Sequence, residues 1–191
     1  MNIIRRTAIA VLALTAVAPR ILAQEQDTQA REAYFRAVAE FFSLPPSEVS
    51  IIGEWRLASD EIPVALFVAH RAGVSPEAVV ALRRSGKSWS ELARRFRLDA
   101  SQFYVPIPAG ASAGRLQDAY DRYRGVSADR WGEVSLADSD IVGLVNLRIL
   151  AQTLRMPPET VLARAGNGSW ALLYARLIRD NDGSRDRQER P

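Results

Sequence analysis

The sequence contains no cysteine and only one histidine, His70. Without cysteine there are no disulfides, so the apolar core must hold the chain together. A zinc site would need carboxylate ligands, and no Gly-x-Ser-x-Gly motif accompanies His70 to indicate a serine hydrolase. The Gly-Lys-Ser within residues 83–88 lacks the earlier glycine of a phosphate-binding loop. We therefore predict no metal and no cofactor, and we assign no catalytic residue from sequence.

Excess charge of one sign is also lacking. The chain has 25 basic and 22 acidic residues, and residues 1–23 contribute three arginines and no acid. Residues 24–191 therefore carry 22 residues of each sign. Proteins that bind nucleic acids owe much of their affinity to a basic surface that neutralises phosphates. The balanced charge argues against a nucleic-acid partner.

A long apolar run is missing as well, although the N-terminus is apolar. Arg5 and Arg6 precede an apolar stretch over residues 7–18, and Ala23 offers a small residue for cleavage. This is the layout of a secretory signal peptide, and the stretch is shorter than the roughly 20 residues that span a bilayer. We predict a signal peptide over 1–23 and a periplasmic or secreted protein with no membrane span after cleavage. A retained anchor and a buried first helix are the alternatives.

What the sequence does contain is helical periodicity with strong capping signals. Ser59, Ser75 and Ser88 stand before three apolar-periodic segments, and Glu91 completes a capping box with Ser88. The third segment carries a stripe of Trp89, Leu92, Ala93 and Phe96. An earlier segment, 28–44, has the same periodicity and stops at two prolines. These patterns predict four helices over residues 24–106.

The second half repeats this order. Segments 112–126, 138–154, 157–166 and 168–180 are again helical in pattern, and Trp170 takes the place of Trp89. The shared order predicts a duplicated unit of about 80 residues. We expect an all-α protein of two tandem, diverged units, 24–106 and 107–180, packed as one helix-turn-helix-like bundle. Residues 181–191 lack apolar side chains and are predicted to form a disordered tail.

Several residues are candidates for binding nucleic acid or a ligand, and each of them also has an interpretation as a purely structural residue. Arg94, Arg95 and Arg97 follow a glycine turn as in a DNA-binding helix-turn-helix, but such a helix also suits any bundle. Trp89 and Trp170 would serve ligand stacking or, as their place in the apolar stripes favours, core packing.

The acids near the two Gly-Glu motifs are the remaining candidates. Glu54 with Asp60, or Glu133 with Asp140, would supply the acid and base of a glycan hydrolase if the carboxylates converge. Most of these acids stand at predicted helix starts, where a carboxylate caps free amides instead. Capping is the interpretation that we favour.

Three stretches in a fixed order, 59–96, 103–107 and 138–162, resemble a group of exported bacterial proteins whose activity is not known. This resemblance spans about residues 59–165 and implies an envelope location and no catalytic residue. Residues 66–83 show a looser likeness to peptidoglycan-binding LysM modules, but the strands that flank such a module are missing. We therefore predict a non-enzymatic interaction or scaffold module with an envelope protein partner. An envelope glycan hydrolase and a nucleic-acid reader are the alternatives.

Overall fold

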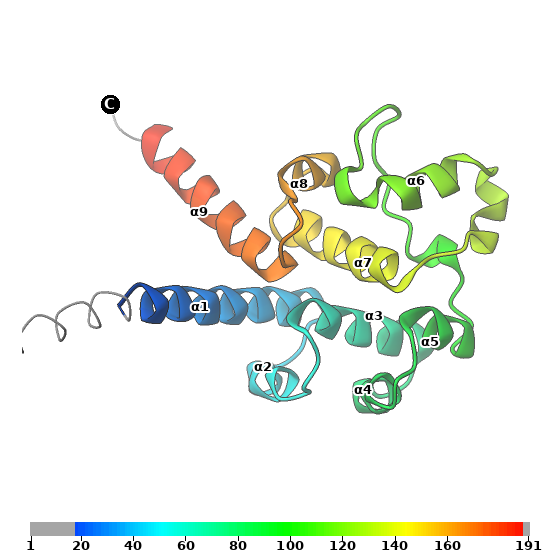
Figure 1. The fold of residues 1–191 in the computed structure, drawn as a ribbon, viewed down its shortest axis with the longest axis horizontal. Helices are drawn as coiled ribbons and strands as arrows, with labels where there is room; N and C mark the ends of the chain where they lie inside the picture. The colour runs from blue at the N-terminus through cyan, green and yellow to red at the C-terminus, as the bar shows by residue number, and fades with distance from the viewer. Residues whose placement is uncertain (1–17, 189–191) are drawn as a thin grey trace, which may run out of the picture.

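The computed structural model describes residues 18–188, and all regular structure in this range is helical (Figure 1). The predicted all-α class is confirmed. Most of the predicted signal peptide, 1–17, lies outside the described residues. The α-helices are α1 (Ala18–Phe41), α2 (Pro46–Gly53), α3 (Ile62–Ala72), α4 (Pro76–Arg84), α5 (Trp89–Arg95), α6 (Gln117–Arg124), α7 (Asp138–Thr153), α8 (Pro158–Arg164) and α9 (Trp170–Gln188). Short 3-10 turns are η1 (Ser59–Glu61), η2 (Ala100–Gln102), η3 (Gly114–Leu116) and η4 (Ala128–Glu133).

Helices α3 and α7 form the centre of the molecule. Every residue from Ile62 to Ala69 is buried, and α7 is buried over most of its length. A helix that is apolar on all sides requires partners on all sides. The two helices pack against each other, α1 also contacts α7, and α4 and α8 each pack on the central helix that precedes them. Both halves of the chain therefore share one continuous core and form one body.

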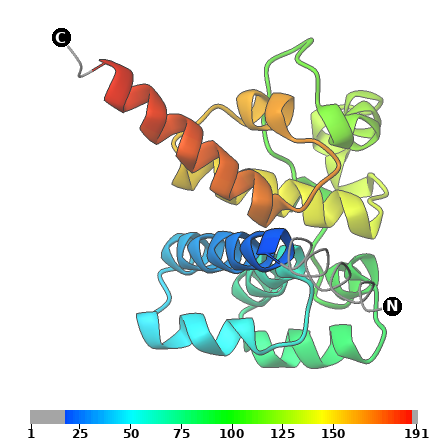
Figure 2. The ribbon, with the colours of Figure 1, turned by 60° about the vertical axis from the view of Figure 1, so that its left-hand side comes forward.

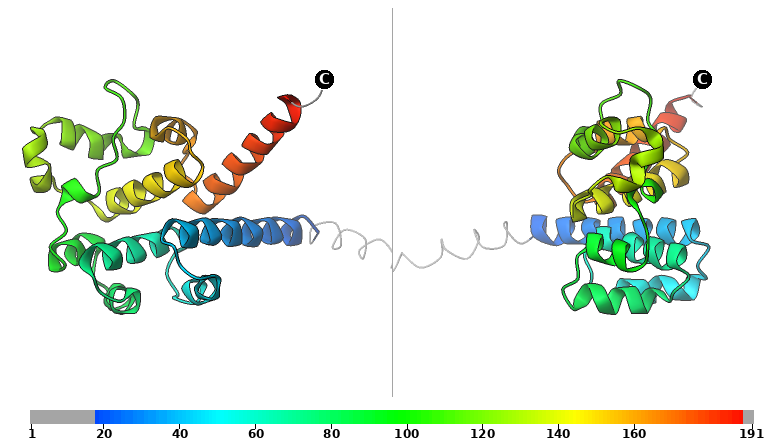
Figure 3. Two further views of the ribbon diagram at one scale, coloured as in Figure 1. Left: turned by 180° about the vertical axis from the view of Figure 1, so that it is seen from behind. Right: turned by 90° about the vertical axis from the view of Figure 1, so that its right-hand side faces the viewer.

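The helices α1 to α5 form one layer of the molecule and α6 to α9 form the other, and α3 and α7 pack together where the two layers meet (Figures 1 and 2). Helices α1 and α9 pack together although they come from opposite ends of the chain, and their far ends diverge (Figure 3). The three helices α3, α4 and α5 of the first half are followed by α7, α8 and α9 in the second half. A duplicated origin of the two halves remains a prediction.

The predicted caps are right at two of the three positions. The Ser75 and Ser88 hydroxyls accept from Ala78 and Glu91 amides, and the Ser88–Glu91 capping box is complete. Ser59 does not cap α3, because a 3-10 turn precedes that helix and Glu61 is its first flanking residue. This turn leaves the neighbouring carboxylate of Asp60 free to bond elsewhere.

Two further segments differ from the sequence prediction. Helix α2 was not foreseen, since its eight residues are too few for a clear apolar period. Helix α9 continues to Gln188 instead of giving way to a disordered tail after Asp180. Adding residues to a helix that has already formed costs far less than starting one, and residues 181–188 contain no proline to stop it.

Three buried tyrosines hold the core together through their hydroxyls. The Tyr34 hydroxyl donates to Asn146 Oδ1, and those of Tyr120 and Tyr123 donate to the carbonyls of Val105 and Ala100, both at 2.6 Å. Burial raises the pKa of all three phenols above the usual value, and for Tyr34 the charge of Asp60 adds to the effect.

We predict that the protein loses stability in alkali. The native state keeps these phenols protonated, so above about pH 10 the unfolded state releases protons first and the free energy of unfolding falls. For each such phenol, the free energy of unfolding falls by about 1.4 kcal/mol per pH unit. Urea unfolding at a series of pH values, with phenolate absorbance followed in parallel, measures this. Ionisation of all five tyrosines while the protein stays folded would contradict it.

Candidate functional site

The start of α9 receives a carboxylate from the other half of the chain. Asp60 accepts hydrogen bonds from the backbone amides of Trp170 (3.0 and 3.1 Å) and Ala171 (3.3 Å) and from the Ser169 hydroxyl (3.0 Å). The first amides of a helix have no partner within it, and the helix dipole favours a negative charge there. Asp60 therefore serves as a long-range cap, in addition to the local cap from Ser169 to Ala171.

The start of α5 is held in the corresponding way. Asp138, which opens α7, accepts the Ser90 amide at 3.1 Å, next to the local cap from Ser88. Arg83 at the end of α4 forms one ion pair with Glu61 of its own half and another with Asp138 of the other half. The second pair links the two halves. Glu61 also accepts the indole Nε1 of Trp89 at 2.9 Å. Each tryptophan-initiated helix is thus capped by an acid from the opposite half.

Both tryptophans are core residues, as we favoured from the sequence. Trp89 is completely buried and Trp170 is 3% exposed, so neither ring offers a surface for a ligand. A guanidinium lies over each ring: Arg83 at 5.1 Å from the centroid of Trp89 and Arg115 at 3.7 Å from that of Trp170. The stacked cations add to the binding of each ring in its place.

A buried polar network continues from the start of α9 into the core. Asn146 is fully buried on α7, and its Nδ2 donates to the carbonyls of Asp60 and Val142, each at 2.8 Å. Its Oδ1 accepts from Tyr34 of α1. Every hydrogen-bonding atom of this amide side chain is therefore used to join α1, η1 and α7. This network fixes where Asp60 lies.

The two acids of each predicted carboxylate pair, Glu54 with Asp60 and Glu133 with Asp140, do not line a common cavity. Asp60 and Asp140 both line a cleft of about 550 Å³ with Arg115, whereas Glu133 lines a different groove and Glu54 is exposed at the end of α2. Asp140 is buried, forms an ion pair with Arg122 and accepts the Ala137 amide at 2.8 Å. Both acids of the cleft are thus occupied in holding helix starts, as the capping interpretation expected.

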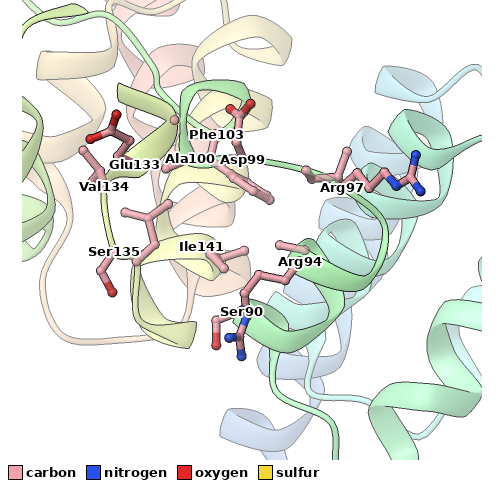
Figure 4. Close-up of a pocket in the computed structure, with 14 residues that line it drawn as sticks. Ser90, Arg94, Arg97, Asp99, Ala100, Phe103, Glu133, Val134, Ser135 and Ile141 are labelled. Carbon is pink, nitrogen blue, oxygen red and sulfur yellow. The ribbon is translucent and has the colours of Figure 1, made fainter. Parts of the chain in front are cut away.

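The larger cavity is a groove of about 650 Å³ between the two halves (Figure 4). One wall is α5 with the turn after it, and the other is the end of η4 with the segment that leads into α7. Its floor is apolar and buried, and consists of Ala93, Leu98, Ala100, Phe103, Leu136 and Ile141. Polar and charged residues from both walls stand at its rim.

Local structure fixes the first wall. Arg97 adopts a left-handed conformation (φ 57°), and the Leu98 amide then bonds to the Ala93 carbonyl at 2.8 Å, which ends α5. Asp99 accepts the Ser101 amide at 3.0 Å and starts η2. The turn therefore directs Leu98 into the floor and leaves Arg97 exposed.

The second wall is held by aromatic packing. The ring of Trp131 lies 4.0 Å from that of Tyr104, and its Nε1 donates to the Tyr123 carbonyl at 3.1 Å. With η4 fixed in this way, residues 134–137 lead into α7 without helix or turn, and Val134 and Ala137 at their two ends have extended dihedral angles. This segment follows the second Gly-Glu motif, but the motif did not indicate a groove wall, since the position of the segment depends on contacts with distant aromatic residues.

Of the helix-turn-helix arginines, Arg94 and Arg97 line this groove and Arg95 does not. All three are exposed, and within residues 18–188 none of their side chains has a hydrogen bond or an ion pair. Among the described residues, no group of three or more acidic, histidine or cysteine side chains is placed to hold a metal ion. In the same range, no helix has the length and apolar character needed to cross a membrane.

Comparison with known proteins gives no relative: no protein-family model, no curated protein and no solved structure matches the chain.

We predict that Asp60→Ala destabilises the protein by about 2 kcal/mol, because it removes the charged cap of α9 and leaves buried amides unpaired. Urea unfolding followed by tryptophan fluorescence measures the loss. Asp129→Ala is the matched control, since Asp129 is exposed in η4 and its side chain makes no hydrogen bond within the described residues. For this variant we expect the free energy of unfolding to change by no more than about 0.5 kcal/mol. Equal unfolding midpoints for the two variants would contradict the capping role of Asp60.

Proposed function

We propose that this protein is a non-enzymatic interaction module of the cell envelope, and that it docks its partner in the groove between α5 and η4. The signal-peptide layout of residues 1–23 and the resemblance to exported bacterial proteins support the location. The observation that carries the docking role is the groove itself. It combines a buried apolar floor with two rim arginines, Arg94 and Arg97, whose side chains have no partner among residues 18–188.

The distribution of bonded groups favours docking over hydrolysis. The acids that a glycan hydrolase would use are bonded to helix amides or to arginines: Asp60 to α9, Asp140 to Arg122 and Glu133 to Arg130. A general acid or base must be able to exchange a proton with a substrate, and a carboxylate that caps a helix is a poor source of one. At the rim of the groove, by contrast, the side chains of Arg94 and Arg97 form no hydrogen bond or ion pair with any of the described residues.

We also propose that the two halves arose by duplication. The mutual capping supports this idea, because Asp60, just before α3, reaches the start of α9, and Asp138, at the start of α7, reaches the start of α5. Two copies related by an approximate two-fold axis would exchange contacts in this manner.

A photocrosslinking amino acid placed at Ser135 in the living cell tests the proposed function. Ser135 is exposed and lines the groove. We expect one recurrent envelope protein to be captured from this position. We also expect the protein's own N-terminus to be Gln24, as cleavage after Ala23 requires.

Ser50 supplies the matched control, as it is exposed on α2 and is not part of the groove. We expect no capture of the same protein from Ser50. Equal capture from both positions, or none from Ser135, would contradict docking in the groove, and an intact residue 1 would contradict the predicted export.

A further inference from the structure

The groove contains a short extended segment whose backbone is not paired. Residues 134–136 are neither helix nor turn, and Val134 has extended dihedral angles (φ −64°, ψ 128°). Within residues 18–188, the amides of Ser135 and Leu136 and the carbonyls of residues 134–136 make no hydrogen bond to the protein. Backbone groups that are not used within the protein can pair with an added strand, and the amides and carbonyls of an extended peptide match their spacing.

Side chains along this segment alternate as on a strand. Leu136 is buried and belongs to the floor of the groove, whereas Ser135 and Ala137 on either side of it are exposed. An added strand would also alternate, so every second side chain would face the apolar floor. The floor, which includes Phe103 and Ile141, suits aliphatic side chains at those positions.

The charge of the rim favours one sign in the occupant. Arg94 and Arg97 have no acidic partner in the described part of the chain. The acids at the rim are already engaged, because Glu133 pairs with Arg130 at 2.7 Å and Asp99 bonds to the amide and hydroxyl of Ser101. With Arg130 counted beside Glu133, three arginines stand against the two acids, so the groove has a formal charge of +1, and an acidic side chain complements its arginines.

From these three features we infer that the groove binds an extended peptide segment of the partner, with aliphatic residues alternating with at least one Asp or Glu. The segment pairs its backbone with residues 134–136, places aliphatic side chains on the floor and directs a carboxylate to Arg94 and Arg97. This inference rests on the proposed docking function and specifies the chemistry of the partner.

Selection from a phage library of random nonapeptides against the purified protein tests the inference. We expect the selected peptides to be enriched in an Asp or Glu that is flanked by aliphatic residues. Arg94→Glu with Arg97→Glu should weaken their binding at least tenfold. Arg84→Glu with Arg179→Glu is the matched control, since it makes the same change of net charge at exposed arginines outside the groove, and it should bind like the wild type.

Amide hydrogen exchange then tests the backbone pairing. A selected peptide should slow exchange at Ser135 and Leu136, which have no protein partner in the free state. Peptides without acidic enrichment, or with unchanged exchange at these amides, would overturn the inference. Tighter binding of a single-stranded thymidine oligonucleotide than of any selected peptide, lost in the Arg94 and Arg97 variant, would replace the peptide by a nucleic acid.

The two proposals fail in different ways. If the crosslinker at Ser135 captures one envelope protein while the library yields no binder, the extended acidic segment is wrong and docking in the groove stands. If neither experiment finds a partner, the proposed function itself is wrong.

Discussion

The fold depends on a reciprocal exchange of helix caps, in which a carboxylate from each half of the chain bonds to the first amides of a helix in the other half. Helices α5 and α9 both begin where the halves meet, and each begins with a buried tryptophan. Amides at a helix start that is shielded from water need an acceptor from elsewhere, or the helix loses stability. Asp138 and Asp60 supply these acceptors from opposite halves. With no cysteine in the chain, this exchange and the shared core around α3 and α7 take the place of covalent links.

The exchange also explains where the polar groups of the molecule are used. Arg83 joins Glu61 to Asp138, Asn146 joins Tyr34 to the backbone of Asp60, and Arg115 covers Trp170. Of the acids that were candidates for a catalytic set, Asp60 and Asp140 bond to backbone amides at helix starts. The groove next to α5 is different, because there the side chains of Arg94 and Arg97 and the backbone of residues 135–136 have no hydrogen-bond partner in the described part of the chain. This contrast is the physical basis for placing recognition at the groove.

Local sequence signals were sufficient for those elements that depend only on neighbours along the chain. The caps at Ser75 and Ser88 and the buried tryptophans follow from residues within one or two turns, and the structure confirms them. Sequence patterns failed where distant contacts decide. The Asp60 carboxylate is used by α9, 110 positions later, and not by its own helix. The groove wall depends on Trp131 packing against Tyr104, and no local pattern around either residue indicated this contact between distant positions.

The most direct test of this account is native-state hydrogen exchange at two amides, those of Ser90 and Trp170. If mutual capping joins the halves into one cooperative body, both amides exchange only through global unfolding, and their free energies of opening are equal to each other and to that of the whole protein. Substitution of Asp60 by Asn should then lower both values together. Independent exchange, with Trp170 accelerated and Ser90 unchanged, would show that the two helix starts are separate local caps and would contradict the account.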